Sequence, residues 1–169
     1  MITGRSISRL AAVTALVAAS ILGGGVAANA APPAGYIVQY SVINKSTLST
    51  NYTNLSNELA RCNAASAGIT CSISKTTSAS RSISLSLGIT RAAVASGLGI
   101  SADTSQSIGV SCTSPALQAG QSLRAYPVGT RYSYQVQKRT YIGASVTVEN
   151  SGTLYAFNPR ANSFTCKIV

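Results

Sequence analysis

Polar and apolar residues alternate along the middle of the chain. Every even position from 72 to 86 is Ser or Thr, whereas positions 83, 85, 87 and 89 are Ile or Leu. A period of two residues is typical of a β-strand, so this segment is predicted to form a strand with one face of hydroxyl groups. A second strand is expected over residues 100–112, in which Ile108, Val110 and Cys112 share the inward face.

Two segments carry helical signals. Apolar side chains recur at steps of four, three, four and three residues, at Leu48, Tyr52, Leu55, Leu59 and Cys62. This spacing predicts an amphipathic helix near residues 48–62. A second short helix is expected over residues 91–98, because Thr90 can cap its start and Gly99 can adopt the left-handed conformation that ends it.

Further strands are predicted on both sides of this region, at residues 36–43, 131–148, 153–158 and 163–169. Gly143 marks a bend or bulge, and the run from Asn150 to Gly152 predicts a tight turn. Proline and glycine within residues 113–129 instead predict a connection with little regular structure. The chain is therefore predicted to be mainly β, an antiparallel sandwich or strongly bent sheet of about six strands with one or two short helices.

The first 30 residues have the features of a secretory signal peptide. Arg5 and Arg9 precede an apolar core at residues 10–22, and the small residues Ala28 and Ala30 frame a cleavage site. The mature chain is expected to be a single β-rich domain of residues 31–169, secreted to the extracellular space and without a transmembrane helix. It keeps 11 basic and three acidic residues, a formal charge of +8.

Four cysteines in an exported chain predict two disulfides, for which three pairings exist. We favour Cys62 with Cys71, which closes a short loop of small residues. The other pair is then Cys112 with Cys166, each of which ends an alternating apolar segment. A metal or redox site is the weaker interpretation, because the chain has no C-x-x-C motif and no histidine. No metal or cofactor is predicted.

The composition argues against most catalytic centres. Only 9% of the 169 residues are charged, with 13 Lys and Arg against three Asp and Glu, and histidine is absent. Triads that use histidine are therefore excluded. Ser72 and Lys75 match the S-x-x-K spacing, but on a strand they point to opposite faces. A hydrolase that uses Asp103 or Glu149 is the remaining catalytic alternative, and no enzyme activity is predicted.

The basic residues are scattered, and Lys138 with Arg139 form the only adjacent pair in the mature chain. Four nearby tyrosines, at residues 126, 132, 134 and 141, offer flat surfaces on which a ligand can stack. The candidate binding residues are Lys138, Arg139, Tyr132, Tyr134 and Tyr141. The alternative is that these tyrosines fill the sheet and the basic residues keep the protein in solution.

Residues 72–148 resemble the membrane-inserting half of aerolysin-like pore-forming toxins. The resemblance rests on the hydroxyl-rich strand, a short break, a second strand, and a further strand that opens with the run Tyr126 to Tyr134. It implies an amphipathic hairpin that turns its apolar face to lipid, where Lys75 and Arg81 would be costly. The Ala-rich signal and the run Ser151 to Pro159 also resemble small exported actinobacterial proteins of unknown role.

The predicted function is a secreted, basic, non-enzymatic binding or interaction module that acts at or outside the cell surface. Its expected partner is an unknown protein or an anionic cell-surface polymer, and peripheral contact with a membrane is left open. Nucleic acid is not the expected partner, because no dense basic cluster is present. The alternative is an aerolysin-like pore-forming protein.

Overall fold

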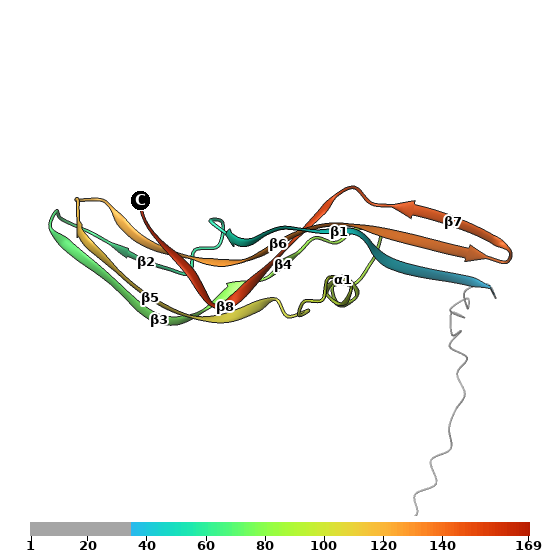
Figure 1. The fold of residues 1–169 in the computed structure, drawn as a ribbon, viewed down its shortest axis with the longest axis horizontal. Helices are drawn as coiled ribbons and strands as arrows, with labels where there is room; N and C mark the ends of the chain where they lie inside the picture. Colours follow the sequence, from blue (N-terminus) through green and yellow to red (C-terminus); the bar gives the residue numbers. More distant parts are fainter. Residues whose placement is uncertain (1–34) are drawn as a thin grey trace, which may run out of the picture. The chain divides into compact units, whose positions relative to one another are not determined.

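The longest strand, β6 (Ser122–Ile142), joins most of the fold together. The computed structural model describes residues 35–169, so the predicted signal peptide lies outside the described residues. Along most of its length β6 has an antiparallel strand on each edge (Figure 1). Its partners are β1 (Tyr36–Thr53), β2 (Ala60–Asn63), β7 (Ser145–Asn150) and β8 (Leu154–Ile168). The two-residue strand β4 (Ser82–Ile83) pairs with β8 and completes a six-stranded sheet.

A separate antiparallel ribbon consists of β3 (Ile69–Ser80) and β5 (Ser105–Leu117). We call this pair the β3–β5 ribbon. Its outer face consists of exposed Ser and Thr residues and one glycine, at residues 72, 74, 76, 78 and 80 of β3 and residues 105, 107, 109, 111 and 113 of β5. The predicted hydroxyl face is therefore confirmed.

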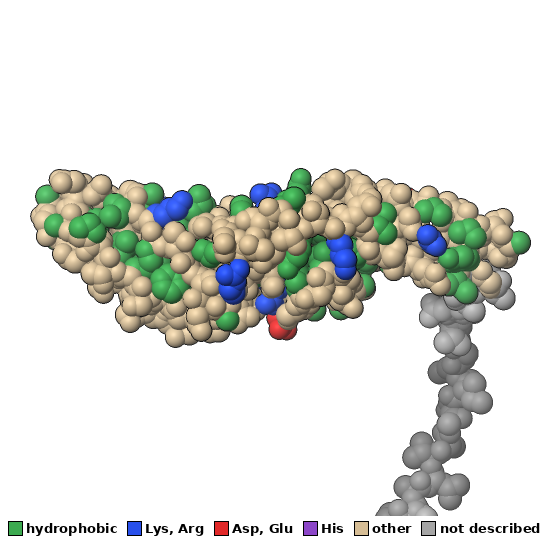
Figure 2. All heavy atoms as spheres, in the orientation of Figure 1, with side chains coloured by type: hydrophobic (Ala, Val, Ile, Leu, Met, Phe, Trp, Pro, Cys, Tyr) green, Lys and Arg blue, Asp and Glu red, His purple; other side chains and the backbone are tan. Residues whose placement is uncertain are grey.

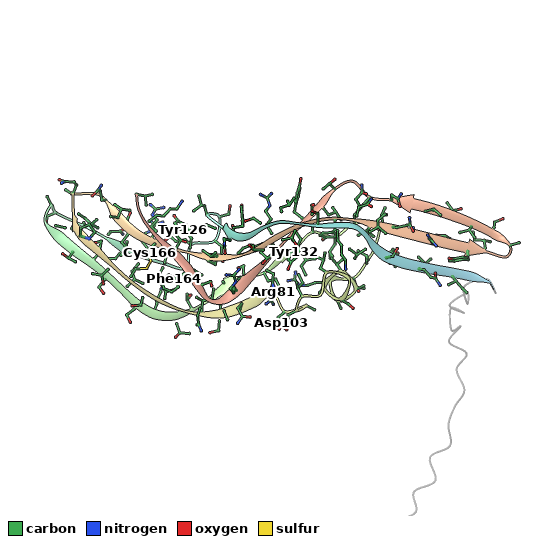
Figure 3. The ribbon with its side chains drawn as sticks, in the orientation of Figure 1. Arg81, Asp103, Tyr126, Tyr132, Phe164 and Cys166 are labelled. Carbon is green, nitrogen blue, oxygen red and sulfur yellow. A yellow bond between two sulfur atoms is a disulfide. The ribbon has the colours of Figure 1, made fainter. Side chains whose placement is uncertain are left out.

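The inner face of the ribbon packs against the six-stranded sheet and forms the first of two apolar cores. Ile73, Ile108 and Leu117 from the ribbon meet Leu123 and Ala125 of β6 there. Half-buried Phe164 and Cys166 of β8 close this core in the same half of the fold (Figure 3). The sheet and the ribbon are thus held together by burial of apolar surface.

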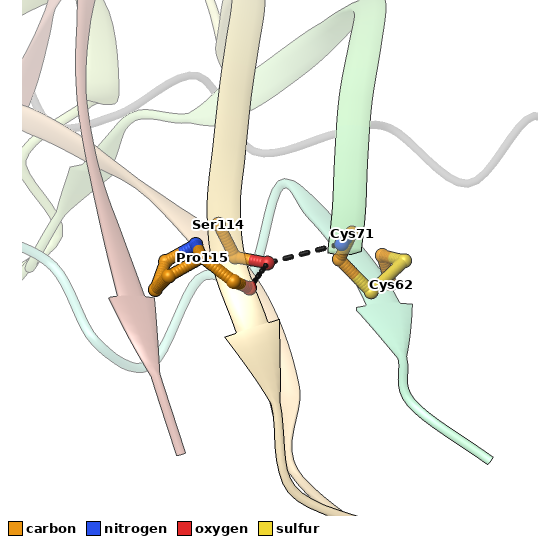
Figure 4. The surroundings of a disulfide bond; sticks show 4 residues. All are labelled: Cys62, Cys71, Ser114 and Pro115. Carbon is orange, nitrogen blue, oxygen red and sulfur yellow. Dashed lines mark hydrogen bonds between the residues drawn. A yellow bond between two sulfur atoms is a disulfide. The ribbon is translucent and has the colours of Figure 1, made fainter. Parts of the chain in front are cut away.

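Two disulfides join the ribbon to the large sheet, with the pairing that was favoured from the sequence. Cys62 of β2 is bonded to Cys71 of β3, and Cys112 of β5 is bonded to Cys166 of β8. Beside the first bond, the Cys71 backbone N–H donates to the Ser114 hydroxyl, which donates in turn to the carbonyl of Pro115 (Figure 4). Disulfides of this kind fit an oxidising compartment.

The second core lies under the short helix α1 (Arg91–Leu98). Val94 and Leu98 pack against Tyr134 and Val136 of β6 and Ala156 of β8. The predicted caps are confirmed, because the Thr90 side chain accepts a hydrogen bond from the backbone of Ala93 and Gly99 has a φ of 71°. Within residues 35–169, no helix has the length and apolar character needed to cross a membrane.

The helix predicted near residues 48–62 is wrong. Strand β1 continues to Thr53 and stays paired with β6, while Leu48 and Leu55 are exposed. The register shifts three times along β1, and each shift places one extra residue in that strand. A bulge changes the face on which the next side chain lies. Of the stripe, only Leu48 and Tyr52 belong to β1, whereas Leu55 and Leu59 lie in the connection to β2 and Cys62 lies in β2, so the helical spacing runs across three different segments.

The connection predicted over residues 113–129 is also wrong, because β5 runs to Leu117 and β6 begins at Ser122. Pro115 and Pro127 lie where the strand register shifts, positions at which a missing N–H is tolerated. Gly129 follows the second shift, and a Cβ atom there would overlap the backbone of β8.

The long strand predicted from the alternating residues is interrupted at Arg81, which is buried. Its guanidinium donates hydrogen bonds to the Asn158 side chain at 2.7 Å and to the Asp103 carbonyl at 3.0 Å (Figure 3). Beyond Arg81 the chain leaves β5 and pairs with β8 as β4. The alternation therefore continues in the sequence while the neighbouring strand changes.

Candidate functional site

Among residues 35–169, no second layer covers the end of the large sheet that carries β7. It comprises residues 36–41 of β1, 137–142 of β6 and 145–150 of β7, which pair side by side. We call this region the three-strand end. None of its side chains with a described burial is buried. Both faces of this part of the sheet are therefore open to a partner.

Apolar side chains lie on both of these faces. Residues directly opposite each other in an antiparallel pair share a face, so Ile37, Tyr141 and Val146 lie together. Val148 lies on the same face two residues further along, whereas Ile142 lies on the other. Ile37, Ile142, Val146 and Val148 are 56%, 60%, 53% and 51% exposed. Hydrophobic side chains gather over this end of the molecule in Figure 2, at the right of the view.

The basic pair lies on β6 beside these apolar residues. Arg139 pairs directly with Val148, and both basic residues are further from the turn between β6 and β7 than Ile142 and Val146. Lys138 and Arg139 are adjacent in β6, so their side chains point to opposite faces. The Lys138 ammonium lies 3.8 Å from a carboxylate oxygen of Glu149. The Arg139 guanidinium donates to the Gln137 side chain at 2.8 Å and has no ion-pair partner among residues 35–169. Arg139 therefore offers its positive charge to a partner.

Of the predicted binding residues, three lie in the three-strand end and two do not. Lys138, Arg139 and Tyr141 belong to it, and the Tyr141 hydroxyl donates to the Gln39 side chain at 3.2 Å. Tyr132 lies in the middle of β6 and lines a cavity of about 250 Å³ beside α1. Tyr134 is 1% exposed, so it belongs to the second core and offers no surface to a partner.

The environment of Tyr134 explains its place. Its hydroxyl donates a hydrogen bond to the backbone carbonyl of Ser84, which satisfies the one polar group of an otherwise buried ring. Burial raises the pKa of this phenol above its ordinary value, and the nearby charge of Arg91 opposes the rise. The ring is therefore a neutral structural element.

The exposed isoleucines and valines were missed as site residues because alternation assigned them to a core. Ile142, Val146 and Val148 share the parity of Tyr132 and Tyr134, which do pack under α1. The sequence nevertheless contains a signal that these side chains are exposed on both faces of the sheet. Ile37 with Val38, and Tyr141 with Ile142, are adjacent apolar pairs, and such pairs leave neither face of a strand polar.

One acidic residue outside this site forms a small ion-pair cluster. Glu58 accepts two hydrogen bonds of 2.8 Å from Arg61, and its carboxylate lies 3.5 Å from Arg124. The hydrogen bond from Arg61 is the main reason that the pKa of Glu58 lies below its ordinary value. The cluster joins the start of β2 to β6.

No family model, curated protein or solved structure matches the chain.

Proposed function

We propose that the chain is a secreted, non-enzymatic binding module that attaches to an anionic lipid surface through the three-strand end. The observation that carries the proposal is the exposure of apolar side chains on both sheet faces near the turn between β6 and β7, with Arg139 and Lys138 three and four residues from Ile142 along β6. A soluble monomer seldom exposes a continuous apolar region without a partner for it.

The spacing along β6 supports a lipid surface as that partner. Ile142 and Arg139 are three residues apart, which corresponds to roughly 10 Å along a strand. Peripheral segments bury their apolar side chains about 5–10 Å into the boundary between head groups and acyl chains. At this depth Arg139 lies among the head groups, where each basic residue near an anionic surface contributes about 1 kcal/mol. A hydrated wall polymer would use the charges and leave the apolar side chains without a role.

Vesicle flotation at 0.15 M salt tests this proposal with charge-matched variants. The test variant is Ile142→Asp with Val146→Asp, in the three-strand end. The control is Leu48→Asp with Leu55→Asp, which alters two side chains of similar exposure, 51% and 54%, elsewhere. Both variants lose two units of charge, so long-range electrostatics changes equally.

We expect the wild type and the control to float with vesicles that contain anionic lipid, and the test variant to remain unbound. If both variants lose vesicle binding equally, net charge alone determines binding, and the assignment of the three-strand end as the binding surface is wrong. If the protein is retained by isolated cell walls but does not float with vesicles, its partner is a wall polymer and the lipid assignment is wrong.

A second candidate function, a pore-forming protein, is favoured by the β3–β5 ribbon. Its outer face is wholly polar and its inner face is mainly apolar, a pattern that suits a membrane-inserting hairpin. Insertion would require Arg81 to leave its buried hydrogen bonds and would leave β5 bonded to β8 through Cys112 and Cys166. We therefore expect no dye release from vesicles that bind the protein. Dose-dependent leakage together with detergent-resistant oligomers would make pore formation the leading function.

A further inference from the structure

A second candidate site lies in the middle of the large sheet, where the side chain of one arginine lies between two tyrosine rings. The guanidinium carbon of Arg131 in β6 lies 4.9 Å from the ring centre of Tyr52 in β1 and 5.0 Å from that of Tyr155 in β8. These three strands run side by side (Figure 1). Stacking on aromatic faces fixes the plane of the guanidinium, so it is ordered before any ligand arrives.

The hydrogen-bonding capacity of the Arg131 side chain is not used by any side chain or backbone group of residues 35–169. The neighbouring arginines Arg81 and Arg91 donate to backbone carbonyls at 2.7–3.0 Å. Arg131 forms no ion pair among residues 35–169, and no side-chain hydrogen bond of the described residues includes it. Its planar set of donors matches the two oxygens of a carboxylate.

A cavity of about 160 Å³ opens beside this guanidinium, and its polar lining also favours an anion. Asn54 and Ser82 contribute to its wall together with Tyr52, Arg131 and Tyr155. The side-chain oxygen Oδ1 of Asn54 accepts a hydrogen bond from the backbone N–H of Ser56, so the side-chain nitrogen Nδ2 remains as a donor. The Arg131 guanidinium and the Asn54 side-chain nitrogen therefore offer donors to an anion in this cavity.

The size and the rim of the cavity indicate a single acidic sugar unit. Its volume equals that of about five water molecules in the liquid, enough for one small ring and too little for a folded segment. Tyr155 is 45% exposed at the rim, and its ring offers a flat apolar surface on which a sugar ring can lie. We propose that Arg131, Tyr52 and Tyr155 form a binding site for a uronic acid residue, with the carboxylate on Arg131 and the sugar ring against Tyr155. This site is separate from the three-strand end and does not depend on lipid binding.

Titration with glucuronate, followed by NMR of the protein, tests the site. For 13 non-hydrogen atoms at ordinary ligand efficiency we expect a Kd of about 1 mM. Glucose lacks the carboxylate and acetate lacks the ring, so each should bind at least tenfold more weakly. Binding of acetate as tight as that of glucuronate would overturn the sugar assignment, and no response to glucuronate at 20-fold this concentration, about 20 mM, would overturn the site.

Variants separate recognition from charge and from folding. Arg131→Gln should weaken glucuronate binding at least tenfold, and Arg131→Lys, which keeps the charge and loses the planar donors, should do nearly the same. Arg160→Gln is the control with the same loss of charge, because Arg160 is exposed and contacts Thr50 and Asn51 instead. The proposal is wrong if Arg131→Lys, folded as judged by its NMR spectrum, binds glucuronate like the wild type. It is also wrong if Arg160→Gln weakens binding as much as Arg131→Gln.

Discussion

Removing the two disulfides one at a time should destabilise the protein by clearly different amounts. The bond between Cys62 and Cys71 closes a loop of sequence separation 9, and the bond between Cys112 and Cys166 closes one of 54. In the chain-entropy treatment these loops correspond to about 2.5 and about 4 kcal/mol. The variant that lacks the bond between Cys112 and Cys166 should therefore be less stable than the variant that lacks the other bond, by about 1.5 kcal/mol in the free energy of unfolding.

The two pairs are well matched for this comparison. Each pair has one buried and one half-buried cysteine, and all four belong to or pack against the first core. Replacing both members of a pair by alanine should therefore leave similar cavities, and the difference between the variants reports loop length. Each variant also keeps the other bond between the β3–β5 ribbon and the large sheet.

Urea unfolding, followed by circular dichroism, measures the difference. With a slope of about 1–3 kcal/mol per molar urea, the two midpoints should differ by roughly 0.5–1.5 M. Equal midpoints, or a lower midpoint for the Cys62→Ala/Cys71→Ala variant, would refute the loop argument. In that case local packing around the ribbon, and not restriction of the unfolded chain, would determine the contribution of each bond.

Three further substitutions test the fold. Tyr134→Phe should cost about 0.5–1.5 kcal/mol in unfolding free energy, because the hydrogen bond from the Tyr134 hydroxyl to the Ser84 carbonyl is lost. Gly129→Ala should cost at least about 1–3 kcal/mol in the same assay, since its methyl group overlaps the backbone of β8. Glu58→Gln should be less stable than the wild type above about pH 4.3, the pKa of an unfolded glutamate. This difference should vanish as the pH falls through the lowered pKa of the folded carboxylate, and a difference that persists at pH 2 would contradict the ion-pair explanation.

Local signals in the sequence predicted the parts of the fold that depend on near neighbours. Helix α1 follows from the Thr90 and Gly99 caps, which act within one turn. The hydroxyl face of the β3–β5 ribbon follows from strict alternation over an uninterrupted stretch. Both disulfide pairs followed from loop length and from the parity of Cys112 and Cys166 with their apolar neighbours.

The predictions that were wrong concern features that depend on contacts between residues distant in the sequence. The apolar stripe of residues 48–62 is compatible with a helix, and only the pairing of β1 and β2 with β6 shows that its members lie in two strands and the connection between them. The same limit applies to the site. Alternation places Ile142 and Tyr134 on the same face, but α1 covers Tyr134 and nothing in the described chain covers Ile142. Which part of a long strand receives a second layer is decided by tertiary packing.

A single tryptophan at the turn between β6 and β7 tests the central claim most directly, because the chain has no tryptophan of its own. In the variant Ala144→Trp we expect the emission to shift to shorter wavelength on anionic vesicles and to be quenched by lipids brominated in their acyl chains. Leu48→Trp, at a position that is also exposed but lies outside the three-strand end, should show neither change. An unchanged spectrum for Ala144→Trp, or equal quenching of both variants, would contradict attachment through the three-strand end.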